Sequence, residues 1–213
     1  MNEEGGYLGA MTYQAIYASA FEKLKKAYSD DSTNGVLTHL QKNLNHAENS
    51  SPGFLFDLAK ILLSEAKLTV NLQESFLRMH ATAPVDDLEM PQYAHRADFQ
   101  ELSIRAIALR RVLARVPDEM KERRPFLETI KEIASSIKKL LDATNVILQV
   151  IPQQSQPLLE KRKREFVHYS KRFSNTLKEY FRDQNQTQVF VAANQLIFQT
   201  TQIVRTVRDR IRV

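Results

Sequence analysis

The spacing of two lysines in one predicted helix suits either the border of a binding site or a plain solvent face. The segment IKEIASSIKKLL (130–141) places Lys131 and Lys138 seven residues apart, with the small residues Ala134 and Ser135 between them. Seven residues are just under two helical turns, so both lysines fall on one face, separated by about 10 Å along the axis. Small side chains between two cations leave room for a bound group.

A second predicted helix repeats this arrangement. In KRFSNTLK (171–178), Lys171 and Lys178 are again seven residues apart, and Ser174 and Asn175 lie between them. If the two helices are antiparallel neighbours, four lysines frame a shallow trough with a floor of small residues. Such a trough fits an amphipathic helix that has an apolar face flanked by Asp or Glu. The alternative is that all four lysines are ordinary solvated side chains.

The other residue types with reactive side chains form no catalytic or metal-binding pattern. The five histidines are scattered, without an H-E-x-x-H spacing and without acids at ligand distance along the chain. No cysteine is present, which excludes disulfides, thiolate metal sites and a cysteine nucleophile. We therefore expect neither an enzyme nor a cofactor or metal site.

A short basic run offers a second candidate site. KRKREF (161–166) opens a predicted helix with four consecutive cations, and such a cluster is suited to anionic lipid headgroups. Aromatic residues are few around it, so nucleic acid is a weaker candidate. The alternative is again a solvated helix face. The cluster consists of Lys161, Arg162, Lys163 and Arg164.

Charge divides the chain into two unequal halves. Residues 1–96 hold 8 Lys and Arg against 12 Asp and Glu, whereas residues 97–213 hold 22 against 13. The second half is therefore the one that attracts acidic partners. With 43% hydrophobic and 26% charged residues, the chain has globular composition. It contains no run of 18 apolar residues and no secretory signal, so we expect a cytoplasmic protein.

The first 80 residues predict several short helices, with a turn at Asp30–Gly35. Short helices are marginal alone, and about 70–80 residues rarely bury enough apolar surface for a secure core. One of them, FLFDLAKILL (54–63), is apolar around most of its circumference. Such a helix must be covered. We expect a second chain to cover it, the alternative being the C-terminal half of the same chain.

Residues 81–97 predict a linker, because they contain two prolines and no helical stripe. From Asp98 onward four longer amphipathic patterns follow, with short connections, so 98–213 predicts an up-down four-helix bundle. The expected fold class is thus all-α, with an N-terminal helical domain (1–80), a linker (81–97) and a bundle (98–213).

Several separated segments together resemble one family. TIKEIASSIKKLLDATN (129–145), KREFVHYSKRFSNTLKEYF (163–181) and VFVAANQLIFQTTQIV (189–204) are similar to the programmed cell death protein 10 family, also called the cerebral cavernous malformation 3 family. SPGFLFDLAKILL (51–63) and VNLQESFLRM (70–79) match in the same order. The resemblance covers nearly the whole chain and depends on no single motif.

The resemblance implies a non-catalytic adaptor. Its N-terminal domain would form a homodimer or pair with germinal-centre kinases of subfamily III, and its bundle would resemble focal-adhesion-targeting domains. The bundle would bind leucine-aspartate motifs of paxillin-like and malcavernin-like proteins. Striatin-phosphatase assemblies, phosphoinositides, and Golgi and plasma-membrane association are further implied, but no nucleic acid. The family's groove lysines fall on Lys131, Lys138, Lys171 and Lys178.

The expected dimer interface combines the stripe of the first helix with positions implied by the resemblance. The chain departs from the vertebrate pattern within this set, since a polar residue stands at 43 where a small apolar one is usual. A polar side chain there would alter the strength or register of the dimer. The expected interface residues are Tyr13, Ile16, Phe21, Leu40, Asn43, Leu62 and Leu63.

Overall fold

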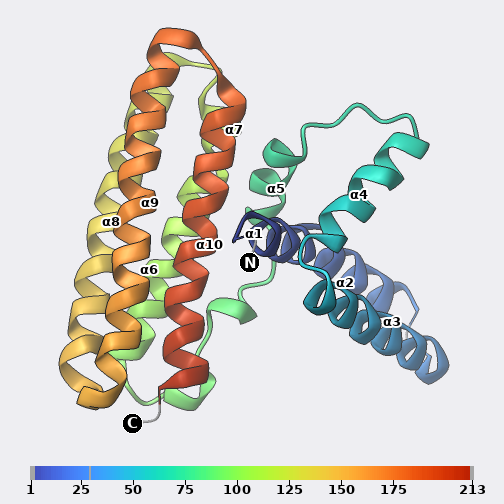
Figure 1. The fold of residues 1–213 in the computed structure, drawn as a ribbon, viewed down its shortest axis with the longest axis horizontal. Coiled ribbons are helices and arrows are strands. Elements are labelled where there is room, and N and C mark those ends of the chain that lie inside the picture. The colour runs from blue at the N-terminus through green and yellow to red at the C-terminus, as the bar shows by residue number, and fades with distance from the viewer. Residues whose placement is uncertain (1–2, 29, 212–213) are drawn as a thin grey trace. The chain divides into compact units, whose positions relative to one another are not determined.

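The computed structural model describes residues 3–28 and 30–211, and these form helices and turns without a β-strand (Figure 1). The chain divides into two compact units, Met1–Ala83 and Pro84–Val213. Each unit has its own buried apolar side chains, such as Leu55 and Phe76 in the first and Phe99 and Phe166 in the second. The all-α fold class predicted from the sequence is confirmed.

The N-terminal unit is built from short helices around a small core. A continuous helical run begins the unit, α1 (Glu3–Thr12) leading into a π-helical turn (Tyr13–Tyr17) and then α2 (Ala18–Ala27). The other helices are α3 (Asp31–Ser50), α4 (Phe54–Glu65) and α5 (Leu72–His80). α1 packs on α4, and α5 packs on the π-helical turn.

Polar caps explain where two of these helices begin. Asp30 accepts a hydrogen bond from the Thr33 N–H at 2.8 Å, and this contact lowers the pKa of Asp30. The turn expected at Asp30–Gly35 is therefore wrong, because Asp30 is an N-cap and α3 starts at the next residue. Asn71 caps α5 by accepting hydrogen bonds from the Gln73 and Glu74 N–H groups.

Glu48 connects three helices of the N-terminal unit. Its carboxylate, on α3, accepts hydrogen bonds from the Gly53 N–H at 2.7 Å and the Leu55 N–H at 2.9 Å, at the start of α4. Gly53 has a φ of 99°, which a residue with a side chain rarely adopts. On α1, a Cβ at Gly9 would lie 1.7 Å from the Glu48 Oε1 atom, so only glycine fits there without displacing this carboxylate.

We expect Glu48→Gln to lower the free energy of unfolding of the N-terminal unit by about 1–2 kcal/mol, because the charged acceptor of two N–H groups at a helix N-terminus becomes neutral. Thermal unfolding followed by circular dichroism measures this change. Glu65→Gln is the matched control, since Glu65 is exposed on α4. Equal unfolding temperatures for the two variants would contradict this role of Glu48.

The C-terminal unit is a four-helix bundle, and its long helices run alternately up and down in Figure 1. They are α6 (Ala97–Ala114), α8 (Arg123–Val150), α9 (Gln156–Asp183) and α10 (Gln186–Arg210), with a short α7 (Val116–Glu119) between α6 and α8. α6 packs against α8, α9 against α10, and α10 against α6, while the backbones of α8 and α9 are less closely packed. The predicted up-down bundle is confirmed.

Sequence signals set the ends and the core of these helices. Ile151 is extended before Pro152, which ends α8, and Pro157 lies in the first turn of α9. Asn185 caps α10 by accepting from the Gln188 N–H. Apolar side chains repeat at intervals of seven residues and are buried along the bundle axis: Leu102, Leu109, Phe126, Ile133, Leu140, Ile147, Leu159, Phe166, Phe173, Val189, Leu196 and Ile203.

Residues 84–96, here called the strap, lie within the linker predicted over 81–97 and pack on the bundle. The strap forms two short 3-10 turns, Asp86–Leu88 and Pro91–Tyr93, and the first contacts α6 and α10. Leu88 and Met90 are fully buried. Leucine and methionine among acids and prolines make no helical stripe, so periodicity alone did not reveal that this segment belongs to the core.

Polar contacts fix the strap at both ends. Arg110 on α6 is 1% exposed, pairs with the Asp87 carboxylate and donates to the Pro84 carbonyl at 3.1 Å. The Tyr93 hydroxyl donates to the Ile211 carbonyl at 2.6 Å. Arg208 on α10 donates to the strap carbonyls of residues 86 and 87. The strap therefore belongs to the folded C-terminal unit.

Candidate functional site

The side of α8 that carries the predicted lysines is turned away from α6. Glu132 marks the opposite flank, because it accepts from Arg115, the residue between α6 and α7, at 2.6 Å; this hydrogen bond raises the pKa of Arg115. Ala134 lies about 160° around the helix axis from Glu132, on the flank toward α9. Lys131, Ala134 and Lys138 are all exposed. Ser135 is only about 60° from Glu132 and so lies nearer the α6 flank.

On α9, the predicted residues divide between two flanks. Lys171, Ser174 and Lys178 are exposed, and Ser174 donates to the Ser170 carbonyl at 3.0 Å. Asn175, which the sequence placed in the trough, instead lines a pocket on the α10 side of this helix. Lys171 also lines that pocket. The floor of the predicted trough therefore loses Asn175 and Ser135, but keeps Ala134 and Ser174.

Apolar side chains that the sequence analysis did not single out lie along the same face. Leu127 at the start of α8 is 40% exposed, and Phe181 near the end of α9 is 42% exposed. Ile130 and Ile137 are half-buried between the lysine positions and the core of α8. Helical spacing could have placed Ile130 and Ile137 beside this face. Each precedes one of the predicted lysines by one residue and therefore lies about 100° from it around the helix axis.

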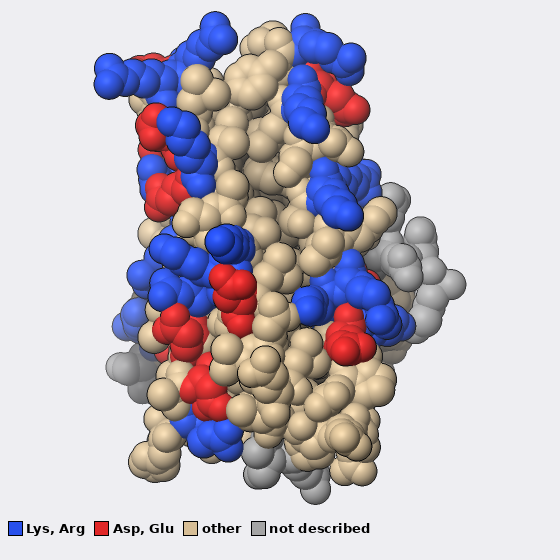
Figure 2. All heavy atoms as spheres, turned by 90° about the vertical axis from the view of Figure 1, so that its left-hand side faces the viewer, with Lys and Arg blue, Asp and Glu red and all other residues tan. Residues whose placement is uncertain are grey.

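Figure 2 shows this face of the bundle. Lys and Arg side chains, with Asp and Glu side chains among them, stand in two columns, and a mostly uncharged strip runs lengthwise between them. Because the face turned to the viewer is the side of Figure 1 on which α8 and α9 lie, the strip follows these two helices. We call it the α8–α9 groove, with Lys131, Lys138, Lys171 and Lys178 as its border.

Most of the border charge is available to a partner. Lys131 pairs with Glu128 at 2.9 Å, and both side chains are more than half exposed. Such an exposed i,i+3 pair is worth less than about 0.5 kcal/mol and is easily exchanged. Within residues 3–28 and 30–211, Lys138, Lys171 and Lys178 form no ion pair. An acidic ligand would therefore meet cations that no carboxylate of these residues neutralises.

The basic run at the start of α9 is more neutral than its sequence suggested. Arg162 pairs with Glu165 at 2.8 Å, and Arg164 lies 3.9 Å from Glu160. In the described part of the chain, Lys161 and Lys163 are the members of this run without an acidic partner. The one-turn spacing of acids and bases in LLEKRKREF could have predicted this pairing.

The N-terminal unit exposes a large apolar surface. Leu62 is 55% exposed and Leu40 46%, whereas Leu63, Tyr13 and Ile16 are half-buried and Asn43 is exposed. Phe21, also predicted for the interface, is buried within the unit. Further exposed apolar residues of this unit were not predicted for the interface: Tyr28, Val36, Ile61, Leu68 and Val70.

No group of three or more His, Cys, Asp or Glu side chains among the described residues could hold a metal ion. None of the helices in this part of the chain combines the length and the apolar character that crossing a membrane requires.

Taken together, a helical unit with exposed apolar side chains and a basic four-helix bundle define an all-α protein of the adaptor class. Comparison with known proteins gives the family. Residues 5–69 match the family model described as programmed cell death protein 10, dimerisation domain, and residues 70–164 match programmed cell death protein 10, C-terminal. The programmed cell death protein 10 homolog of Caenorhabditis elegans is 59% identical over 213 residues, covering 100% of this chain and 99% of that protein. The chain belongs to the programmed cell death protein 10 family.

Proposed function

We propose that the chain is a non-catalytic adaptor whose α8–α9 groove captures acidic amphipathic helices. The observation that carries this proposal is the mostly uncharged strip bordered by four lysines, three of which have no acidic partner in the described residues. A visiting helix would lay its apolar side chains against the exposed Leu127 and Phe181, and its flanking carboxylates would meet the lysines.

The N-terminal unit supplies the second half of the adaptor. It matches a dimerisation domain, and its exposed leucines are the kind of surface that a second helical chain covers. We propose that it pairs either with another copy of the chain or with a germinal-centre kinase of subfamily III. The adaptor would then hold that kinase close to whatever helix the groove captures.

The helices proposed for the groove are leucine-aspartate motifs of paxillin-like and malcavernin-like proteins. In such motifs leucines provide the apolar face and aspartates the flanking charge, which matches the order of lysine, strip and lysine across the groove. Striatin assemblies in the cytoplasm, at the Golgi and at the plasma membrane are the proposed setting. Binding of phosphoinositides at 161–164 receives less support, since two of its four cations are paired within α9.

The groove is tested by reversing one border charge. We expect Lys138→Asp to weaken binding of a fluorescent leucine-aspartate peptide at least about tenfold, because a charge-assisted contact is lost and repulsion is added. Fluorescence anisotropy measures the dissociation constant. Lys139→Asp is the matched control, since Lys139 is the next residue on α8, is also exposed and lies about 100° away from the border.

Binding that is equally weakened by both variants would show only a general effect of net charge. Binding that neither variant weakens would remove the groove from the proposal. Circular dichroism should remain unchanged in both variants, because both lysines are exposed.

A further inference from the structure

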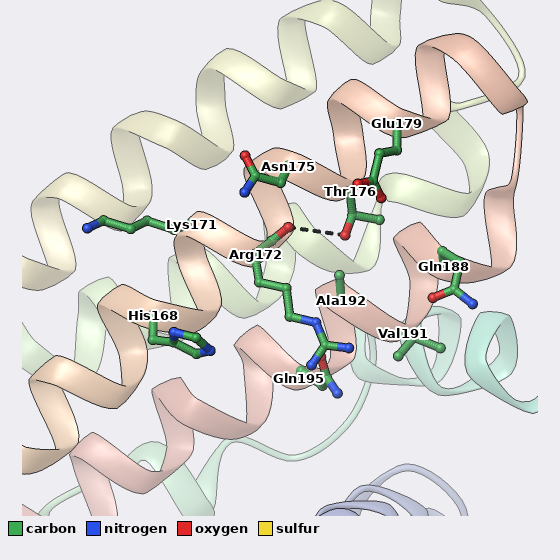
Figure 3. Close-up of a pocket in the computed structure, with 10 residues that line it drawn as sticks. All are labelled: His168, Lys171, Arg172, Asn175, Thr176, Glu179, Gln188, Val191, Ala192 and Gln195. Carbon is green, nitrogen blue, oxygen red and sulfur yellow. Dashed lines mark hydrogen bonds between the residues drawn. The ribbon is translucent and has the colours of Figure 1, made fainter.

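A second concave site lies on the other flank of α9, between α9 and α10. It is a pocket of about 520 Å³, lined by residues of these two helices (Figure 3). Cations gather toward one end, where Lys171 and Arg172 are exposed, and Glu179 stands seven residues further along α9. Seven residues correspond to about 10 Å along the axis, so the pocket has a positive and a negative end.

The positive end has no internal counterion. Neither Lys171 nor Arg172 forms an ion pair in the described part of the chain. Figure 3 shows the Arg172 side chain running from α9 toward α10, with its guanidinium group beside Gln195 and Ala192. A guanidinium group presents donors in a planar fork that suits a carboxylate. The pocket is therefore prepared for an anionic group at this point.

Gln195 adds an acceptor that needs a donor. Its side chain is only 7% exposed, and its Oε1 atom accepts no hydrogen bond from the described residues. This oxygen has less than 1 Å² of accessible surface, so a ligand reaches it only by displacing the side chains that cover it. A buried acceptor without a donor costs about 1–3 kcal/mol, and a ligand that brings an N–H group to this oxygen removes that penalty of the free protein. Arg172 and Gln195 both line this pocket, and their side chains end in the same part of the view in Figure 3, so one ligand can satisfy both.

We propose that this pocket binds a peptide carboxylate together with a neighbouring backbone N–H. The carboxylate pairs with Arg172, and the N–H donates to the Gln195 Oε1 atom. Backbone N–H groups inside a helix are already bonded within it, so the ligand is an extended segment or a chain end rather than the middle of a helix. This separates the pocket from the α8–α9 groove, which is proposed to take a helix.

Two sources supply this chemistry, an internal aspartate and a C-terminal carboxylate. Titrations of the full chain followed by amide NMR distinguish them with three probes: acetyl-Gly-Asp-Gly-amide, acetyl-Gly-Gly-Gly with a free C-terminus, and acetyl-Gly-Asn-Gly-amide. We expect one or both carboxylate peptides to shift the signals of residues 168–179 and 188–195, and the asparagine peptide to leave them in place. Binding of the aspartate peptide identifies an internal aspartate as a source, and binding of the peptide with a free C-terminus identifies a chain end.

Variants locate the contact. We expect Arg172→Gln to weaken carboxylate binding at least about tenfold, and Gln195→Met, which keeps the side-chain volume, to weaken it as well. Arg182→Gln on the same helix is the control and should bind normally, and Lys138→Asp should also bind normally because Lys138 lies outside this pocket. Since Arg172 is exposed, Arg172→Gln tests the proposal even where Gln195→Met fails to fold.

The proposal is overturned if neither carboxylate peptide shifts these signals, if the asparagine peptide shifts them equally, or if Arg172→Gln binds as well as the wild type. The proposal for the α8–α9 groove is contradicted by a different result, namely that Lys138→Asp leaves the binding of the leucine-aspartate peptide unchanged.

Discussion

Replacing Arg110 with methionine is expected to lower the free energy of unfolding of the C-terminal unit by about 3–5 kcal/mol, because it leaves one partner of a buried ion pair uncompensated. Arg110 is 1% exposed and its partner Asp87 is 10% exposed, so water reaches neither charge well. The substitution also removes the donor to the Pro84 carbonyl. The strap would therefore lose its main polar attachment to α6.

Urea unfolding measures the loss of stability, and amide hydrogen exchange shows where it arises. We expect exchange to accelerate first across the strap, since that segment is attached through this contact. Arg111→Met is the matched control, because Arg111 is the next residue on α6 and is exposed. In the double variant Arg110→Met with Asp87→Leu, part of the stability should return, since no charge is left buried.

Equal stability of the Arg110→Met and Arg111→Met variants would contradict this account. So would faster exchange throughout the bundle with a strap that remains protected.

The second large effect is expected in the N-terminal unit, where Leu62→Asp combined with Leu63→Asp should convert a dimer into a monomer. Burying a leucine at an interface is worth about 1.5–3 kcal/mol, and a carboxylate there must in addition lose its hydration. Together the two changes should raise the dissociation constant of the dimer by about a thousandfold or more. Leu62 is 55% exposed in the single chain, so its replacement does not remove core packing.

Light scattering coupled to size-exclusion chromatography gives the mass of each variant. Leu127→Asp is the control, because it places the same charge on an exposed leucine of the bundle and should leave the dimer intact. A wild-type chain that is already monomeric at high micromolar concentration would refute the dimer, and a double variant of dimeric mass would place the interface elsewhere.

The positions of the bundle helices could be predicted closely from the sequence. The four amphipathic patterns predicted from Asp98 onward correspond to α6, α8, α9 and α10. Apolar residues at every third or fourth position and prolines at the connections are local signals, so they can be read without knowledge of the partners. The Asn71 cap was predictable for the same reason.

The strap and the start of α3 show where local signals fail. The Asp30 side chain favours both a turn and an N-cap, and the apolar residues of the following helix decide between them. Leu88 and Met90 become buried because Arg110 and Arg208 hold the strap by its carbonyls and by Asp87. Arg110 and Arg208 lie about twenty to one hundred and twenty residues from the strap along the chain, and no pattern within the strap indicates these partners.

The sequence by itself determined which residues form helices, that the second half is basic, and that lysines recur every seven residues on two of its helices. Tertiary structure decided which flank of each helix those residues occupy. It left Lys138 and Lys178 exposed without acidic partners among the described residues, and it turned Asn175 toward α10. The physical reason is that helical periodicity fixes the angle between side chains on one helix, whereas packing against the neighbours fixes the rotation of the whole helix.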